Sequence, residues 1–495
     1  MPQERYDFVN DDSTPMYEKE EGSKKSIYLL WGDRVKVLEE GRERVKVKAR
    51  GQTGWVEKDA LGGESLLELY FIDVGQGDGI LIKTPSFRHI MIDGGFPRGK
   101  QDTGKNAADF VDWKFVEDYG MEHIDLDAMI VSHCDEDHYG GLSDLLDVRQ
   151  SDELDAKYVH VERFYHAGLS WWVPDDGDGR TLGPYEKVGR ESYWTRLLED
   201  RDAVEQASNE GDPHQLAGNW GKFFDKVLST QTHNGEPTPV ERLSHASGYV
   251  PEFGPDVVGE PSIKVLGPVE FEGPCLRRFS GGNSQNTNGV SLLLRVDFGN
   301  ARMILTGDLN KRSQLALLAD YEGEEDEFAC DVAKACHHGS EDISYTFLSA
   351  LKPSATIISS GDNEGHDHPR PSIISASALT GYVQLDEDGE GLVTPLVYST
   401  ELARSVDLGI PTKLEELDKD GEVTDTLRGA AFRRSLLHLK GTRRKTKKAE
   451  YARVVGRLIY GLVNVRTDGK RILCATLDEQ KSKWRIKSFA ARFQS

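Results

Sequence analysis

A ten-residue stretch, SHCDEDHYGG at positions 132–141, constrains the fold of this chain more than any other feature. It directly follows a largely apolar run at residues 126–131, which predicts a buried strand. Imidazoles and carboxylates in the loop after a buried strand are a common way for a rigid scaffold to present ligands to a metal ion. The side chains of His133 and Asp135 can point one way while those of Asp137 and His138 point the other. This spacing favours two metal ions side by side. The alternative is a solvated acidic turn before a helix, and the other motifs of the chain argue against it.

The charge of the chain is divided unevenly along its length. The formal net charge is -23 over 495 residues, which taken alone argues against non-specific binding to nucleic acid. Residues 428–495, however, hold nineteen Lys and Arg against four Asp and Glu. A basic region of this kind can neutralise phosphates, and the alternative is a solvated helix or a disordered link. The candidate nucleic-acid contacts are Arg443, Arg444, Lys445, Lys447 and Lys448.

Length and composition predict a cytoplasmic protein of two or three domains; a bacterial source is implied only by the family resemblances given below. The N-terminus is polar and carries no secretory apolar segment. No stretch approaches the roughly 20 apolar residues of a membrane span, so we expect no membrane partner. The cysteines are scattered and odd in number, which favours a reducing compartment.

The N-terminal segment has the alternation of a small β domain. Around residues 45–49 apolar and charged side chains alternate, and the unit closes with GQTGWV at residues 51–56. This pattern resembles that of bacterial Src-homology-3-like domains. The resemblance implies that residues 1–64 form a small β-barrel with a flexible lead. Such modules bind peptides, wall fragments or a neighbouring domain, so a peptide or protein partner is expected. The alternative is a packing cap.

Strands that end in polar, chemically active residues recur in the rest of the chain. A strand at residues 89–92 ends at Asp93, and a later strand ends at Asp308. Two further strands lead to the pair HH at 337–338 and to His368. Placing a carboxylate or an imidazole at a strand tip puts it at the edge of a sheet, where ligand sites are built.

The recurrence of strand, motif and helix predicts α/β layering over residues 65–400. Residues from about 150 to 258 lose the regular pattern, so we interpret them as an insertion over the active face. Residues 401–495 form the basic C-terminal region, in which we expect closing strands.

Six motifs in this order carry a family resemblance. They are FIDVGQGD at 71–78, DGG at 93–95, SHxDxDH at 132–138, LTGD at 305–308, HHGS at 337–340 and HP at 368–369. With them, residues 67 to about 370 resemble the metallo-β-lactamase fold, and within it the hydrolase domain of the ComEC competence proteins. The resemblance implies a four-layer αββα sandwich with the active site at one edge.

The resemblance also implies a centre of two divalent metal ions. Its implied ligands are His133, Asp135, Asp137, His138, Asp308 and His337, with Asp308 bridging the ions. His337 is favoured over His338 because it lies nearer the strand end. Asp93 would orient the ligand loop through hydrogen bonds. Asp135 stands where many members of the fold have a second histidine, and this exchange hardens the site, so zinc and manganese both remain open.

The implied activity is that of a metal-dependent phosphodiesterase or nuclease that acts through a metal-bridging hydroxide. Asp137 belongs to the catalytic set, and His338 or His368 would contact the phosphate or protonate the leaving oxygen. Nucleic acid is therefore the expected substrate. One alternative is hydrolysis of a small phosphodiester or ester, such as a nucleotide signal or phosphocholine. Another is a peptide- or wall-binding module that uses the metal domain as a scaffold.

Overall fold

The computed structural model describes most of the chain. The residues described are 4–101, 104–148, 152–177, 179–209, 214–271, 273–361, 368–400, 413–417, 423–428, 452–455, 461–478 and 483–493. The basic candidates Arg443, Arg444, Lys445, Lys447 and Lys448 lie outside these ranges. Within these ranges, no helix combines the length and the apolar character needed to cross a membrane.

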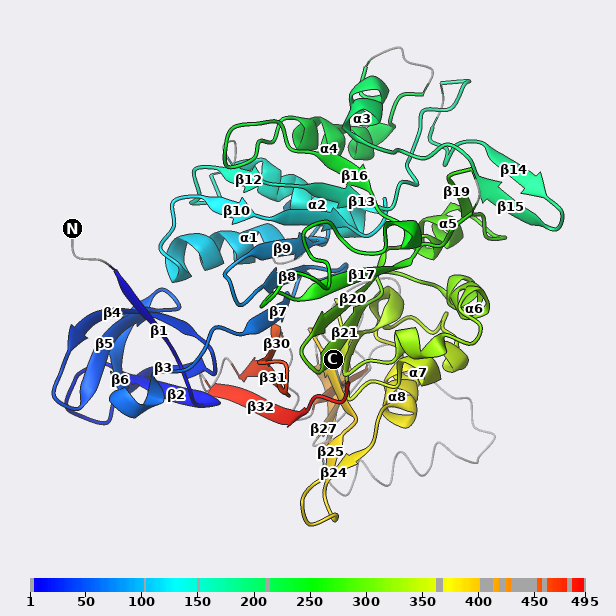
Figure 1. Ribbon diagram of the computed structural model, residues 1–495. Helices are drawn as coiled ribbons and strands as arrows, with labels where there is room; N and C mark the ends of the chain where they lie inside the picture. Colours follow the sequence, from blue (N-terminus) through cyan, green and yellow to red (C-terminus); the bar gives the residue numbers. More distant parts are fainter. Residues whose placement is uncertain are drawn as a thin grey trace.

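Two large β-sheets form the centre of the molecule (Figure 1). The first has nine strands, in the order β16 (Val240–Arg242), β13 (Phe164–His166), β11 (Ala128–Val131), β9 (His89–Ile92), β8 (Ile80–Lys83), β7 (Leu67–Phe71), β30 (Val463–Thr467), β31 (Arg471–Asp478) and β32 (Lys483–Ala490). The second has six strands, in the order β17 (Ser262–Gly267), β20 (Leu293–Phe298), β21 (Ala301–Leu305), β22 (Val332–Lys334), β23 (Ala355–Ile358) and β26 (Leu396–Ser399).

Helices cover the outer face of each sheet and complete four layers. The nine-stranded sheet is covered by α1 (Ala107–Trp113), α2 (Glu136–Leu146) and α4 (Gly218–Leu228). The six-stranded sheet is covered by α6 (Lys311–Asp320), α7 (Tyr345–Leu351) and α8 (Pro371–Thr380). Between the sheets, Leu69 and Ile130 pack in one apolar core with Leu294 and Met303. Strands covered on both faces are expected to be almost continuously apolar, as β11 and β23 are. The predicted αββα sandwich is confirmed.

The N-terminal sheet is open rather than a closed barrel. Its order is β1 (Arg5–Phe8), β4 (Arg34–Glu40), β5 (Arg44–Ala49), β6 (Gln52–Glu57), β2 (Ser13–Tyr17) and β3 (Lys25–Leu30). Since β1 and β3 are the two edges of this order, the barrel expected from the sequence is not closed. Strands β1 and β2 also occupy part of the predicted flexible lead. They have only four and five residues, and neither of them was predicted from the sequence.

A buried ion-pair network joins the N-terminal sheet to the nine-stranded sheet. The Arg466 side chain, on β30, is fully buried, and its Nη2 lies 2.7 Å from Asp33 Oδ1 and 3.1 Å from Glu68 Oε2. Its Nη1 donates to the carbonyl oxygen of Trp31 at 2.6 Å. Although burial opposes ionisation, Arg466 and Arg50 hold the pKa of Asp33 well below its ordinary value. The two sheets are therefore held together by charge as well as by apolar contact.

The region from about 150 to 258 does not lie wholly outside the sandwich. Strands β13 and β16 pair in parallel with the nine-stranded sheet, as its last two strands on that side. Each has three residues, too few to show a period in the sequence. The remainder includes α3 (Arg201–Ala207) and the hairpin β14 (Tyr185–Val188) and β15 (Glu191–Trp194), which extends into a four-stranded sheet with β19 (Cys275–Arg277) and β18 (Glu270–Phe271).

The other elements are small. They are α5 (Asn283–Gly289), β10 (Ile124–Leu126) paired with β12 (Val159–Val161), β24 (Gln384–Leu385) paired with β25 (Leu392–Thr394), and a sheet of β27 (Lys413–Leu417), β28 (Val423–Arg428) and β29 (Ala452–Val455).

Candidate metal centre

Parallel strands in both sheets deliver the motif residues to one edge of the sandwich. In the nine-stranded sheet, β9 and β11 are parallel, with Ile92 opposite Ile130, so the loops after them lie side by side. In the six-stranded sheet, β21 and β22 are parallel in the same way. The first pair of loops carries Asp93 and the 132–138 motif, and the second carries Asp308 and the two histidines at 337–338. Residues far apart in the sequence are thereby brought together.

Four of these side chains form a compact cluster. Ligand atoms of Asp137, His138, Asp308 and His338 all lie within 4.8 Å of one another. The Nε2 atom of His338 is 3.0 Å from Asp308 Oδ2 and 3.6 Å from Asp137 Oδ2. The Nε2 atom of His138 is 3.4 Å from the same oxygen of Asp308. Asp308 is thus central to the cluster.

His133 and Asp135 extend the cluster on one side. The rings of His133 and His138 are 4.1 Å apart between centroids, and His133 Nε2 lies 3.7 Å from Asp135 Oδ2. Asp135 accepts a hydrogen bond from Thr287 Oγ1, in α5, at 2.6 Å. Burial, and then the neighbouring Asp137, raise the pKa of Asp135 to about 6. The carboxylate therefore stands where a positive charge would stabilise it.

The hydrogen bonds of three histidine rings show whether the cluster could bind a metal ion. In His133, His138 and His338, the Nε2 atom is buried and forms no hydrogen bond with any described residue. Each Nδ1 atom does have a partner: Ser132 Oγ at 3.1 Å for His133, Asp93 Oδ2 at 2.8 Å for His138, and the Ser359 carbonyl at 3.2 Å for His338. Buried polar atoms are rarely left unbonded. Three orphaned nitrogens facing carboxylates are a donor set that fits divalent metal ions.

The electrostatics of Asp308 agree with this fit. Burial opposes its ionisation, yet His338, His138 and His337 hold the pKa of Asp308 well below its ordinary value. The carboxylate is therefore ionised. A mixed set of imidazole nitrogens and carboxylate oxygens suits both zinc and manganese.

The comparisons with known proteins agree with this geometry. The chain is 32% identical over 105 residues to competence protein ComA of Neisseria gonorrhoeae, covering 21% of this chain and 15% of that protein. It is 23% identical over 316 residues to ComE operon protein 3 of Bacillus subtilis, covering 62% of this chain and 30% of that protein. The chain has a ComEC-like metallo-β-lactamase fold. It spans less than a third of the length of either relative, and no family model matches it.

Two solved structures from the metallo-β-lactamase fold and the β-lactamase superfamily are similar to this chain. YhfI from Bacillus subtilis, a metallo-β-lactamase fold protein, is 11% identical, covers 67% of this chain and 96% of its own, and has a TM-score of 0.32. A metal-dependent hydrolase of the β-lactamase superfamily, Tm1679, is 13% identical over 67% of this chain and 95% of its own, with a TM-score of 0.29. With TM-scores of 0.32 and 0.29, neither structure is used to assign the fold or the site. The ComEC-like fold of this chain rests on its own sheets and on the two sequence relatives.

The position of His337 differs from the expectation for this ComEC-like fold. Its Nε2 atom is 3.9 Å from Asp308 Oδ2, and its side chain is 24% exposed, whereas His338 is fully buried in the cluster. Both histidines have positive φ, 47° for His337 and 52° for His338. The chain therefore leaves its extended path directly after Cys336, and nearness to the strand end does not predict which ring turns inward.

Two further charged residues contact the candidate metal centre and were not assigned a role from the sequence. Lys334 is fully buried, forms an ion pair with Asp78, donates to the Gly307 carbonyl at 2.8 Å and lies 3.6 Å from Asp308 Oδ1. Asp78 Oδ1 in turn lies 3.4 Å from His338 Nδ1. The sequence features that could have indicated their roles are the position of Lys334 inside an apolar strand and that of Asp78 inside a glycine-rich turn.

The remaining predicted residues lie around the cluster. Asp93 is buried and also accepts a hydrogen bond from the Ser132 backbone N–H at 2.7 Å. Asp137 lies in the first turn of α2 and accepts from Gln76 Nε2 at 3.3 Å. His368 is buried, and its ring centroid is 5.8 Å from that of His337, so it lies on the His337 side of the centre.

Proposed function

We propose that the chain is a metal-dependent phosphodiesterase that cleaves nucleic acid. The observation that supports this most is the convergence of three orphaned histidine nitrogens on the carboxylates of one cluster. Two divalent ions in such a site supply Lewis-acid charge for a phosphoryl group and lower the pKa of water. The resemblance to the ComEC competence proteins supports nucleic acid as the substrate class.

The geometry supports a division of the ligands between two positions. His133 and Asp135 would hold one ion, and Asp137, His138 and His338 the other, with Asp308 between them. We assign the sixth ligand position to His338 instead of His337, because only the His338 ring lies wholly inside the cluster.

Other residues of the chain hold this arrangement in place. Asp93 orients the His138 ring so that its Nε2 atom faces Asp308, where that nitrogen would offer its lone pair to a bound metal ion. Lys334 balances part of the charge of Asp78 and Asp308. His337 and His368, on the more open side, would donate hydrogen bonds to the phosphate or to the leaving oxygen.

The test is cleavage of labelled single- and double-stranded DNA and RNA by metal-free protein, with zinc, manganese or magnesium restored in turn. Metal-dependent cutting that is lost in Asp308→Ala and kept in Asp59→Ala, an exposed acid of the N-terminal region, would support the proposal. Bound metal with hydrolysis of small phosphodiesters alone would limit the substrate class. Protein that binds no metal would reject the mechanism.

A further inference from the structure

A positively charged groove is formed by elements that adjoin those of the metal centre. Its volume is about 610 Å³, and it is bounded by the β14–β15 hairpin, by the end of β19 and by α6. Its charged lining residues are Arg190, Glu191, Arg277, Arg278 and Arg312. Four arginines against one glutamate form a local excess of positive charge on a chain whose net charge is -23.

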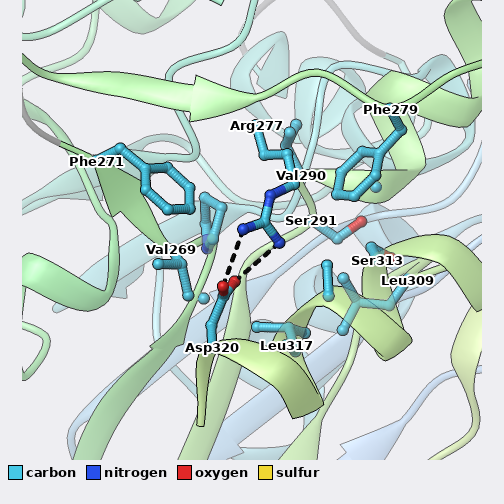
Figure 2. A pocket seen from close by; sticks show the side chains of 14 residues that line it. Val269, Phe271, Arg277, Phe279, Val290, Ser291, Leu309, Ser313, Leu317 and Asp320 are labelled. Atoms are coloured by element: carbon cyan, nitrogen blue, oxygen red, sulfur yellow. Dashed lines mark hydrogen bonds and ion pairs between the residues drawn. The ribbon is translucent and has the colours of Figure 1, made fainter. Parts of the chain in front are cut away.

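One of these arginines is neutralised and three are not. Arg277 forms a two-pronged ion pair with Asp320, at 2.9 and 3.1 Å (Figure 2). Arg190, Arg278 and Arg312 form no ion pair with any residue of the described ranges. Uncompensated cations concentrated in a concave surface attract an anionic ligand.

Arg278 is held in place by aromatic rings. Its guanidinium lies 4.0 Å from the ring centroid of Tyr185 and 5.4 Å from that of Trp194. Its Nε atom is buried and forms no hydrogen bond with a described residue. Stacking restricts the side chain before any ligand arrives, so less entropy is lost when a phosphate binds.

The walls of the groove are linked to the metal centre through short stretches of chain. Arg312 lies in the first turn of α6, which begins three residues after Asp308. On the other wall, Phe279 N–H donates to Asn286 Oδ1 at 2.8 Å, and Asn286 belongs to α5, the helix whose Thr287 bonds Asp135. Both walls of the groove are therefore connected to segments that carry or contact the metal ligands.

The cavity next to the groove cannot serve the same purpose. Phe271, Phe279, Leu317 and the Arg277–Asp320 pair surround it (Figure 2), and its volume is about 20 Å³. A space of that size holds about one water molecule. The open groove is the part of this face that accommodates a substrate.

We propose that the groove binds the phosphodiester backbone of a polynucleotide and leads it to the metal centre, with Arg190, Arg278 and Arg312 as the phosphate contacts. This deepens the proposed function and rests on it. The three arginines act by charge and position, and none of them belongs to the metal centre.

The test uses the full chain with Arg190, Arg278 and Arg312 all changed to Ala. Binding of a fluorescein-labelled single-stranded oligonucleotide is followed by fluorescence anisotropy in EDTA, over a series of salt concentrations. Three lost phosphate contacts should lower the slope of log affinity against log salt by about 2, since each contributes roughly 0.7 for single strands. Metal-dependent hydrolysis of bis(p-nitrophenyl) phosphate should stay unchanged.

Two controls separate charge from structure. The corresponding triple Lys variant should keep the slope of the unmodified protein, and so should Arg42→Ala, a change at an exposed arginine of the N-terminal sheet. An unchanged slope in the triple Ala variant would overturn the proposal, as would loss of small-ester hydrolysis or an unmodified protein that binds no oligonucleotide. The proposed function would fail separately, through absence of metal-dependent hydrolysis of any phosphodiester. Duplex DNA tested in parallel shows which form of polynucleotide binds more tightly.

Discussion

Asp93→Asn offers a direct test of how the metal ligands are oriented. Oδ1 of Asp93 accepts the Ser132 backbone N–H at 2.7 Å, and Oδ2 faces His138 Nδ1 at 2.8 Å. A backbone N–H can only donate, so the amide oxygen of the substituted side chain must take the Ser132 side. The amide NH₂ then faces His138 Nδ1 and donates to it, which places the ring proton on Nε2. His138 could no longer offer its Nε2 lone pair to a metal.

The expected cost is a 10- to 100-fold weaker metal affinity at this position, or about 1.4–2.7 kcal/mol. The backbone should tolerate the change, because Asp93 has φ 55° and asparagine adopts left-handed conformations readily. The measurement is a competition titration of metal-free protein against a chromophoric chelator, with elemental analysis of bound metal.

Asp112→Asn is the matched control. The Asp112 carboxylate is also buried, but it accepts hydrogen bonds from the backbone N–H groups of Asp155 and Ala156, away from the centre. The metal affinity of this variant should equal that of the unmodified protein. A correctly folded Asp93→Asn variant that binds both ions with unchanged affinity would refute the orientation argument.

Three further predictions follow from the buried charges. His338→Ala should remove one bound ion per chain by elemental analysis, whereas His337→Ala should keep both; the reverse result would restore His337 as the ligand. Arg466→Met should lower the free energy of unfolding by about 3 kcal/mol, because among the described residues it leaves Asp33 paired only with Arg50 and Glu68 paired only with Lys83, and an unchanged thermal midpoint would contradict this. Arg466 and Lys83 outweigh the burial of Glu68 and lower its pKa to about 2, so its contribution to stability is complete above pH about 4.5 and is lost as the pH falls towards 2. Thermal midpoints measured from pH 6 to pH 3 should therefore fall, and less steeply in Glu68→Gln.

The strands that end at the motif residues of the metal centre could be predicted from the sequence, because each depends on a local pattern of apolar residues. Short apolar runs at 89–92 and 128–131 are strands in the structure, and each ends at a motif residue. Parallel pairing then places Asp93 beside the 132–138 motif without further information. What the sequence could not decide was the direction of single side chains, such as which of His337 and His338 lies deeper in the cluster.

Strand pairings and ion pairs between distant segments could not be predicted from the sequence, because no local pattern encodes them. Closing strands were expected within residues 401–495, but the sequence does not state which strand they join. In the structure β30 pairs with β7. The charged side chain of Arg466 gave no sign of its burial either, because its partners Asp33 and Glu68 lie in distant segments. The peptide partner expected for the N-terminal module stays a prediction.

The pairing of β30 with β7 has a consequence for the time course of synthesis. Leu67 of β7 pairs with Thr467 of β30, so a ribosome that adds roughly 5–20 residues per second needs about 20–80 seconds to supply the later residue. Throughout that interval β7 presents a bare strand edge, which is a template for pairing with other chains. A nascent chain of this protein is therefore exposed to aggregation until its last strands emerge, and chaperone dependence during translation should exceed that of the finished protein.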